Sequence, residues 1–143
     1  MNHFLLEIIT PDRLAYSDSV DMVTVPSSTG IIGLLADHVP LFSRLVEGEV
    51  KITKGDEEFF LAIGGGFMEV TKTKISILVS RAMHAKELNE AEILKAQTRA
   101  KEAIAHGVKG DELREAHALM RRTILDMKIL KRRHGGVPHS SIH

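Results

Sequence analysis

Residues 46–79, VEGEVKITKGDEEFFLAIGGGFMEVTKTKISILV, decide the fold class of this chain. They contain short runs of β-branched and aromatic residues, which are typical of strands, separated by turn residues. The runs are residues 46–53, 58–63, 66–70 and 74–79, and the turns are residues 54–57 and 71–73. Turns this short join neighbouring antiparallel strands. The stretch therefore predicts two β-hairpins.

The residues before this stretch continue the strand pattern. Runs at 4–9, 20–25 and 30–35 are rich in Val, Ile and Leu, and Pro11 and Pro26 interrupt the sequence between them. Proline is a turn signal because it lacks the N–H that a strand interior needs. No helical stretch separates the strand signals, which favours a small antiparallel sandwich or barrel.

The composition changes near residues 80–86. All six aromatic residues precede position 70, and nine of the twelve alanines follow position 81. Because alanine favours helices and aromatic residues favour strands, the secondary structure is expected to change here. Residues 1–84 carry 7 basic and 11 acidic side chains, and residues 85–143 carry 12 and 8. The formal net charge of zero is therefore a cancellation of −4 and +4.

Apolar residues in the second half recur every three or four positions, which predicts two helices. The first helix is expected at residues 89–105, with Ile93, Ala96, Ala100, Ala103 and Ile104 on its apolar side. The second is expected at residues 112–132, capped by Asp111, with Leu113, Ala116, Met120, Ile124, Met127 and either Leu130 or Lys131 on its apolar side. The short link containing Gly107 and Gly110 predicts an antiparallel helical hairpin. The tail from Gly135 is expected to be disordered.

Several classes of protein are excluded or disfavoured by composition. Without cysteine the chain has no disulfide, thiolate nucleophile or cysteine-ligated metal, so a reducing cytoplasm is the expected compartment. The start, MNHFLLEIITPDR, has no cationic segment before its apolar run, which makes it a poor signal peptide. No stretch approaches the roughly 20 apolar residues that span a bilayer. We expect a soluble protein that could sit beside a membrane.

The sequence offers little catalytic chemistry. Gly64-Gly65-Gly66 lacks the Gly-Lys-Ser/Thr and helix start of a phosphate loop, so a bulge or close backbone contact is the better interpretation. Asp37-His38 is the only adjacent acid–histidine pair and has no nucleophile motif near it in sequence. His139 and His143, the only histidines four residues apart, fall in the tail. We therefore expect no catalytic residue, no cofactor and no resident metal.

A basic run lies near the end of the second predicted helix. Its members are Arg121, Arg122, Lys128, Lys131, Arg132 and Arg133. A solvated helix end, stabilised by the helix dipole, is one interpretation, and an acidic protein partner is the other. Nucleic acid is disfavoured, because no aromatic residue lies nearby to stack on bases.

Several motifs together resemble the ε subunit of F-type ATP synthases. They begin with Gly30 and Gly33, followed by His38-Val39-Pro40-Leu41 and the strand Gly48-Glu49-Val50-Lys51-Ile52. A second block, Gly65-Gly66-Phe67-Met68-Glu69-Val70, precedes the strand at residues 75–79. The order and spacing of these motifs agree with the family over nearly the whole chain.

The resemblance implies an α+β fold: a β-sandwich of about ten strands over residues 1–84, a hairpin of two antiparallel helices over residues 85–134, and a tail from residue 135. It implies a noncatalytic subunit of the central rotor stalk, peripheral at the cytoplasmic face of the inner membrane, whose sandwich binds the γ subunit and the c ring. The resemblance also implies that the hairpin can fold beside the sandwich or extend along γ into the α/β catalytic head, where it inhibits ATP hydrolysis. Candidate contacts are Ile31, Ile32, His38 and Pro40 on the sandwich, and Arg121, Arg122, Lys128, Arg132 and Arg133 on the hairpin.

Two departures from the family pattern bear on partners. Ile31 stands where relatives often have an acid, so an apolar contact with the c ring is expected instead of a polar one. Some relatives bind ATP through Ile/Leu-Asp-x-x-Arg-Ala, but here Asn89 replaces the Asp and Glu92 replaces the Arg. A carboxylate at that position repels phosphate, so ATP binding is expected to be weak or absent. A nucleotide-sensing module of the same fold and a small hydrolase using Asp37-His38 are the competing hypotheses.

Overall fold

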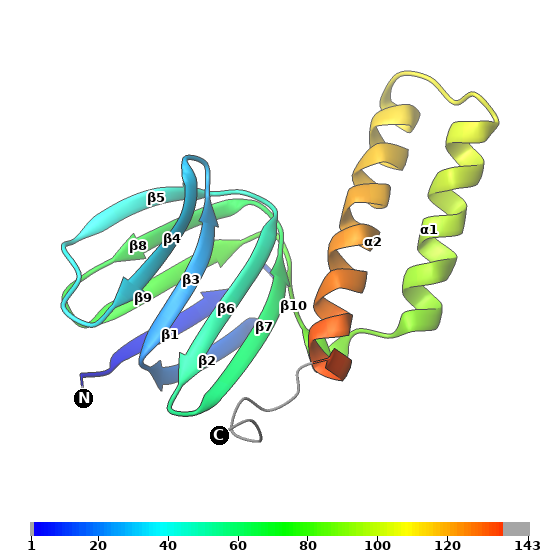
Figure 1. Cartoon of the computed structure of the whole chain (residues 1–143). Helices are drawn as coiled ribbons and strands as arrows, with labels where there is room; N and C mark the ends of the chain where they lie inside the picture. The colour runs from blue at the N-terminus through cyan, green and yellow to red at the C-terminus, as the bar shows by residue number, and fades with distance from the viewer. Residues whose placement is uncertain (1, 136–143) are drawn as a thin grey trace.

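Ten strands come first along the chain, and a short 3-10 helix and two α-helices follow (Figure 1). The computed structural model describes residues 2–135, the last three through their backbone alone. The strands are β1 (Phe4–Ile9), β2 (Leu14–Val20), β3 (Met22–Ser27), β4 (Gly30–Leu35), β5 (Leu41–Leu45), β6 (Gly48–Lys54), β7 (Glu57–Ile63), β8 (Gly66–Val70), β9 (Lys74–Val79) and β10 (Ala82–His84). The helices are η1 (Ala85–Glu87), α1 (Glu90–Ala105) and α2 (Asp111–Gly135).

The strands form one sheet that folds over on itself as a sandwich (Figure 1). Their order is β10-β7-β6-β3-β5-β8-β9-β1-β2, with β4 also paired to β3. The predicted hairpins, β6–β7 and β8–β9, are both present. Every pair is antiparallel except β1–β9, which is parallel. This exception is possible because no hairpin turn joins β1 to β9, so their relative direction is not fixed locally. The expected fold class is confirmed.

Alternate residues of the strands point into a single apolar core. Leu6, Ile52, Leu61, Met68 and Ile77 are all fully buried there. Large aliphatic side chains of this kind each contribute about 1.5–3 kcal/mol when removed from water. The sandwich therefore has a substantial core of its own, independent of the helices.

Three of the strands were not indicated by local sequence. β2 contains three consecutive polar residues, Ser17, Asp18 and Ser19, and β10 is only three residues long. β5 follows Pro40 directly and contains the adjacent polar residues Ser43 and Arg44. Each pairs with a strand that is distant in sequence or lies at a sheet edge, so its extended conformation is imposed by tertiary pairing.

Side chains join the two edge strands, β2 and β10. His84 Nε2 donates to the Ala15 carbonyl oxygen at 2.8 Å. Arg13 Nη2 donates to the Ala82 carbonyl oxygen at 2.6 Å, and both of its terminal nitrogens bind the Glu87 carboxylate. Since Glu87 belongs to η1, these contacts also fix the start of the link to the helices.

The helical hairpin forms as expected, with small differences. Asn89 caps α1 by accepting a hydrogen bond from Glu92 N at 3.1 Å, and Gly107 and Gly110 take left-handed φ values of 77° and 62° in the link. Ile124 was expected on the buried side of the second helix, which is wrong: it is 57% exposed, while Thr123 beside it is buried. The predicted disordered tail begins at Gly135, but α2 extends to that residue. The rest of the predicted tail, residues 136–143, lies outside the described residues.

The glycine triplet allows close backbone packing. A Cβ at Gly66 would collide with the Leu78 carbonyl oxygen, and one at Gly64 would collide with Ser80 Oγ. Gly66 also begins a strand and not a helix. The interpretation as a close backbone contact is therefore confirmed.

Candidate interaction surfaces

Three large apolar side chains project outward from neighbouring strands. Phe42 on β5, Phe67 on β8 and Leu78 on β9 are 68%, 50% and 50% exposed. The Phe42 and Phe67 rings stack with centroids 5.4 Å apart, and Phe67 pairs directly with Leu78 across β8 and β9. We call these three residues the aromatic face. Exposed apolar clusters of this kind mark contact surfaces for other molecules.

The sequence-based search did not select the aromatic face. The alternation of residues along this strand did contain a signal. Met68 and Val70 point into the core, so Phe67 must point to the outer side of β8. An aromatic residue on the outward side of a strand is unexpected unless something covers it. The contact of Phe67 with a second aromatic residue depends on the pairing of β5 with β8. In this register Phe42 lies opposite Glu69 and Arg44 lies opposite Phe67.

The predicted sandwich contacts lie at opposite ends of β4. Ile31, which is 78% exposed, and the half-buried Ile32 follow the β3–β4 turn. His38 and Pro40 lie beyond the other end of β4, in the connection to β5 (Figure 1). A strand of six residues spans about 20 Å. The structure therefore places Ile31 with Ile32, and His38 with Pro40, but keeps the two pairs apart.

The hairpin packs on the outer side of β7 through a second apolar cluster. Its buried members are Ala62, Leu88, Ile93, Ile129 and Leu130, and we call this cluster the hairpin interface. Most of the contact comes from the C-terminal half of α2, which meets β6, β7 and η1. Figure 1 shows the far end of the hairpin projecting away from the sandwich.

Two ion pairs flank the hairpin interface. Arg81 donates from Nη1 and Nη2 to the Asp126 carboxylate at 2.9 and 2.6 Å. Arg132 donates from Nε and Nη2 to Glu49 at 2.8 and 3.0 Å, and its guanidinium lies 5.0 Å from the Phe60 ring centroid. The two pairs have opposite polarity, since α2 supplies the carboxylate to Arg81 and the guanidinium to Glu49. Only the Arg132–Glu49 pair follows the opposite net charges of the two halves.

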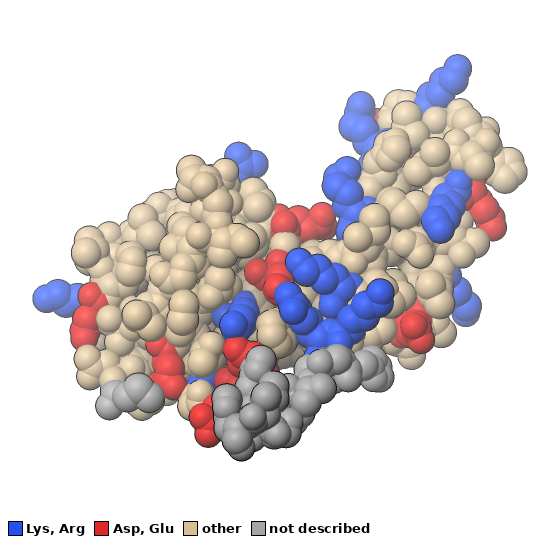
Figure 2. All heavy atoms as spheres, viewed as in Figure 1, with Lys and Arg blue, Asp and Glu red and all other residues tan. Residues whose placement is uncertain are grey.

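The remaining predicted basic residues differ from Arg132. Arg121 and Lys128 are exposed and Arg122 is half-buried, and within the described part of the chain none of the three has a hydrogen bond or ion pair. The side chain of Arg133 lies outside the described residues. Figure 2 shows Lys and Arg side chains gathered over the end of the hairpin nearest the sandwich, with acidic side chains beside them.

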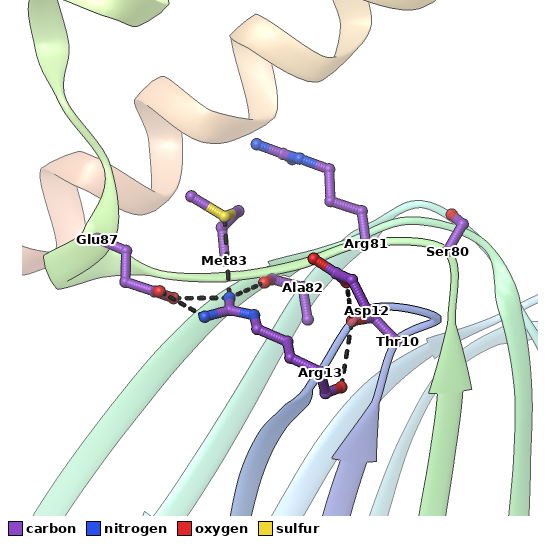
Figure 3. Close-up of a pocket in the computed structure, with 8 residues that line it drawn as sticks. All are labelled: Thr10, Asp12, Arg13, Ser80, Arg81, Ala82, Met83 and Glu87. Carbon is purple, nitrogen blue, oxygen red and sulfur yellow. Dashed lines mark hydrogen bonds and ion pairs between the residues drawn. The ribbon is translucent and has the colours of Figure 1, made fainter.

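A polar cleft of about 320 Å³ opens where the β1–β2 turn meets β10 and η1 (Figure 3). Its charged groups already have partners: Arg13 binds Glu87, Asp12 accepts from Thr10 Oγ1 at 2.6 Å, and Arg81 extends away toward α2. The Arg13 hydrogen bonds lower the pKa of Glu87 to about 2. The cleft is therefore a structural junction without a free charged group for a ligand.

The pair Asp37-His38 does not form a catalytic arrangement. Asp37 Oδ2 accepts from Asn2 Nδ2 at 3.1 Å, and His38 Nδ1 lies 2.8 Å from the Val39 carbonyl oxygen. Neither contact activates a nucleophile. Among the side chains that the structure describes, no group of three acidic or histidine residues is arranged to hold a metal ion. No described helix has the length and apolarity of a membrane span.

Comparison with known proteins identifies the family. The family model described as "ATP synthase, Delta/Epsilon chain, beta-sandwich domain" matches residues 3–85. An ATP synthase epsilon chain from Dehalococcoides mccartyi is 34% identical over 129 residues, which cover 90% of this chain and 92% of the relative. The chain belongs to the family of ATP synthase epsilon chains.

Further epsilon chains extend the match, and solved structures agree with the fold. The Herpetosiphon aurantiacus epsilon chain is 35% identical, covering 90% of this chain and 94% of the relative. A chain of the Euglena gracilis mitochondrial ATP synthase, solved as OSCP/F1/c-ring, has a TM-score of 0.63 at 18% identity, covering 94% of this chain and 81% of that one. A chain of the Tetrahymena thermophila central stalk and c-ring has a TM-score of 0.50 at 18% identity, covering 60% and 69%.

Proposed function

We propose that this chain is a noncatalytic subunit of the rotating central stalk of an F-type ATP synthase and supports ion-gradient-driven ATP synthesis. In this role residues 1–84 attach to the γ subunit and the membrane c ring. Residues 85–134 regulate the α/β catalytic head. The complex holds the chain at the cytoplasmic face of the inner membrane as a peripheral subunit.

The aromatic face is the observation that carries this proposal. Stacked Phe42 and Phe67 rings expose apolar area that a subunit surface can cover. We assign γ to the aromatic face together with His38 and Pro40, because the segment 38–42 leads directly from those residues into β5. We assign the c ring to Ile31 and Ile32 at the opposite end of β4.

Attachment to the stalk is tested by Phe67→Ser in a reconstituted complex. We expect the variant chain to dissociate from γ, since a large apolar contact is lost. Leu94→Ser is the matched control, because Leu94 is similarly exposed, at 47%, but lies on α1 and not on the sandwich. Retention of the Phe67→Ser chain at the level of the Leu94→Ser control would refute the assignment of γ.

Inhibition by the hairpin is tested by reversing the charges of Arg121 and Arg122 to Glu. These side chains have no ion-pair partner among the described residues, so they are available to an acidic loop of the catalytic head. We expect ATP hydrolysis by the reconstituted complex to rise. Lys101→Glu, an exposed position on α1, controls for a general charge effect, and equal hydrolysis by both variants would contradict the regulatory role.

A further inference from the structure

The ion pair between Arg81 and Asp126 joins sandwich and hairpin and is more buried than the Arg132–Glu49 pair. The Asp126 side chain is 7% exposed and the Arg81 side chain is 27% exposed. Both carboxylate oxygens are bound by the guanidinium, at 2.9 and 2.6 Å. Removing one partner of such a pair leaves a buried charge without compensation, which costs far more than the pair contributes.

The second ion pair, Arg132–Glu49, lies in a different environment. The Arg132 side chain is 44% exposed and the Glu49 side chain is 18% exposed. Solvent-exposed pairs contribute little to stability, because water and salt screen them. Arg81 and Asp126 are therefore the charges on which docking of the hairpin depends most.

Apolar burial alone does not determine which side of α2 faces the sandwich. Ile124 is 57% exposed on α2, whereas Ile129 is fully buried in the hairpin interface. A rotated helix could bury Ile124 instead, since apolar attraction has no preferred direction. Only the observed rotation places Asp126 against Arg81, and any other docked rotation that buried Asp126 would leave it without that partner.

We propose that Arg81 and Asp126 form a charge latch, which selects the docked side of α2 and sets how often the hairpin leaves the sandwich. This inference deepens the proposed regulatory role of the hairpin and rests on it. When the latch opens, both groups regain water. Arg122, four residues before Asp126 on the same helix, then lies within reach of the freed carboxylate. Opening therefore also changes the charge that α2 presents to a partner.

The test measures opening of the hairpin interface in the isolated full-length chain. Ala62 is fully buried in that interface, and the chain has no natural cysteine. In an Ala62→Cys background, the rate of alkylation by iodoacetamide therefore follows the population of the open state. Far-UV circular dichroism checks that each variant remains folded.

Three variants are compared in that background. We expect Arg81→Gln to speed alkylation roughly tenfold or more, because Asp126 is left buried and unpaired. We expect Arg81→Gln combined with Asp126→Asn to return only part of the way to the parent rate, because the unpaired charge is gone but the paired hydrogen bonds of the latch are still missing. Glu115→Gln, an exposed carboxylate on the same helix, is expected to leave the rate unchanged.

The rescue by the second substitution is the decisive outcome. The latch is refuted if Arg81→Gln reacts no faster than Glu115→Gln, or if Asp126→Asn fails to slow the reaction in the Arg81→Gln chain. Should Arg81→Gln alone fail to fold, the double variant must still fold and react slowly. Because the assay uses neither γ nor ATP hydrolysis, its failure would leave the proposed attachment to the rotor untouched.

Discussion

The Arg132 guanidinium lies over the Phe60 ring at 5.0 Å while it donates two hydrogen bonds to Glu49. One side chain of α2 thus contacts both an apolar and an acidic residue of the sandwich. A planar guanidinium can do both at once, whereas an ammonium group cannot reproduce the stacking and the paired hydrogen bonds.

Arg132→Lys should therefore weaken docking although it preserves the charge. A cation–π contact at a partly exposed site contributes about 0.5–1 kcal/mol, so alkylation of the Ala62→Cys chain should rise roughly twofold to fivefold. Lys131→Arg, at the exposed neighbouring position, provides the control and should have no effect. An unchanged rate in Arg132→Lys would mean that charge alone, and not geometry, holds this end of α2.

Glu87 should make the free energy of unfolding depend on pH in the acid range. The Arg13 hydrogen bonds lower its pKa in the folded chain from 4.5 to about 2. A lowered pKa stabilises the fold above the unfolded value, and this contribution is lost as the pH falls from about 4.5 to 2. Urea unfolding over this range should show a shallower loss of stability in Glu87→Gln than in the parent chain. Glu115→Gln should retain the parent's slope, and an equally steep slope in Glu87→Gln would contradict the assignment.

Sequence reasoning succeeded where structure is locally determined. Hairpins β6–β7 and β8–β9 follow from short turns between alternating strands, and the helical hairpin follows from apolar spacing and Gly110. The parallel pairing of β1 with β9 joins residues about 70 positions apart, so no local signal encodes it. Conformation is predictable from neighbours, but pairing partners over such distances are not.

The interaction surfaces divide in the same way. Arg132 was predicted to contact a partner because it belongs to a basic run, but the structure pairs it with Glu49, 83 residues away in sequence. The aromatic face requires the register that brings β5 beside β8. Residue type indicates which side chains can make polar or apolar contacts. The tertiary fold decides which of them already have a partner within the chain and which are left for another protein.

Tyr16 should be replaceable by Phe without loss of stability. Its hydroxyl is buried and has no hydrogen-bond partner among the described residues, and its ring packs between Phe59 and His84. An unsatisfied buried hydroxyl costs about 1–3 kcal/mol, so Tyr16→Phe should raise the free energy of unfolding by at least about 1 kcal/mol. Phe59→Leu, which removes part of the same cluster, should lower it. Destabilisation by Tyr16→Phe would mean that the hydroxyl has a partner.

The same residue should lower stability at alkaline pH. Burial raises the pKa of Tyr16 from 10 to about 12. Between these values the unfolded chain loses the phenolic proton while the folded chain keeps it, so the free energy of unfolding falls as the pH rises. Urea unfolding of Tyr16→Phe should lack this decline, and an identical decline in both chains would exclude Tyr16 as its cause.

The start of α1 should not bind ATP. Asn89 Oδ1 already accepts the Glu92 N–H, and Glu90 and Glu92 place two carboxylates in the first turn, where the helix dipole would otherwise attract phosphate. Titration calorimetry of the isolated chain with millimolar ATP should show no binding heat. Asn89→Asp combined with Glu92→Arg restores the two family positions and replaces the Glu92 carboxylate with a cation that can attract phosphate. If this double variant binds ATP and the parent does not, these residues alone exclude the nucleotide, whereas submillimolar affinity in the parent would overturn the prediction.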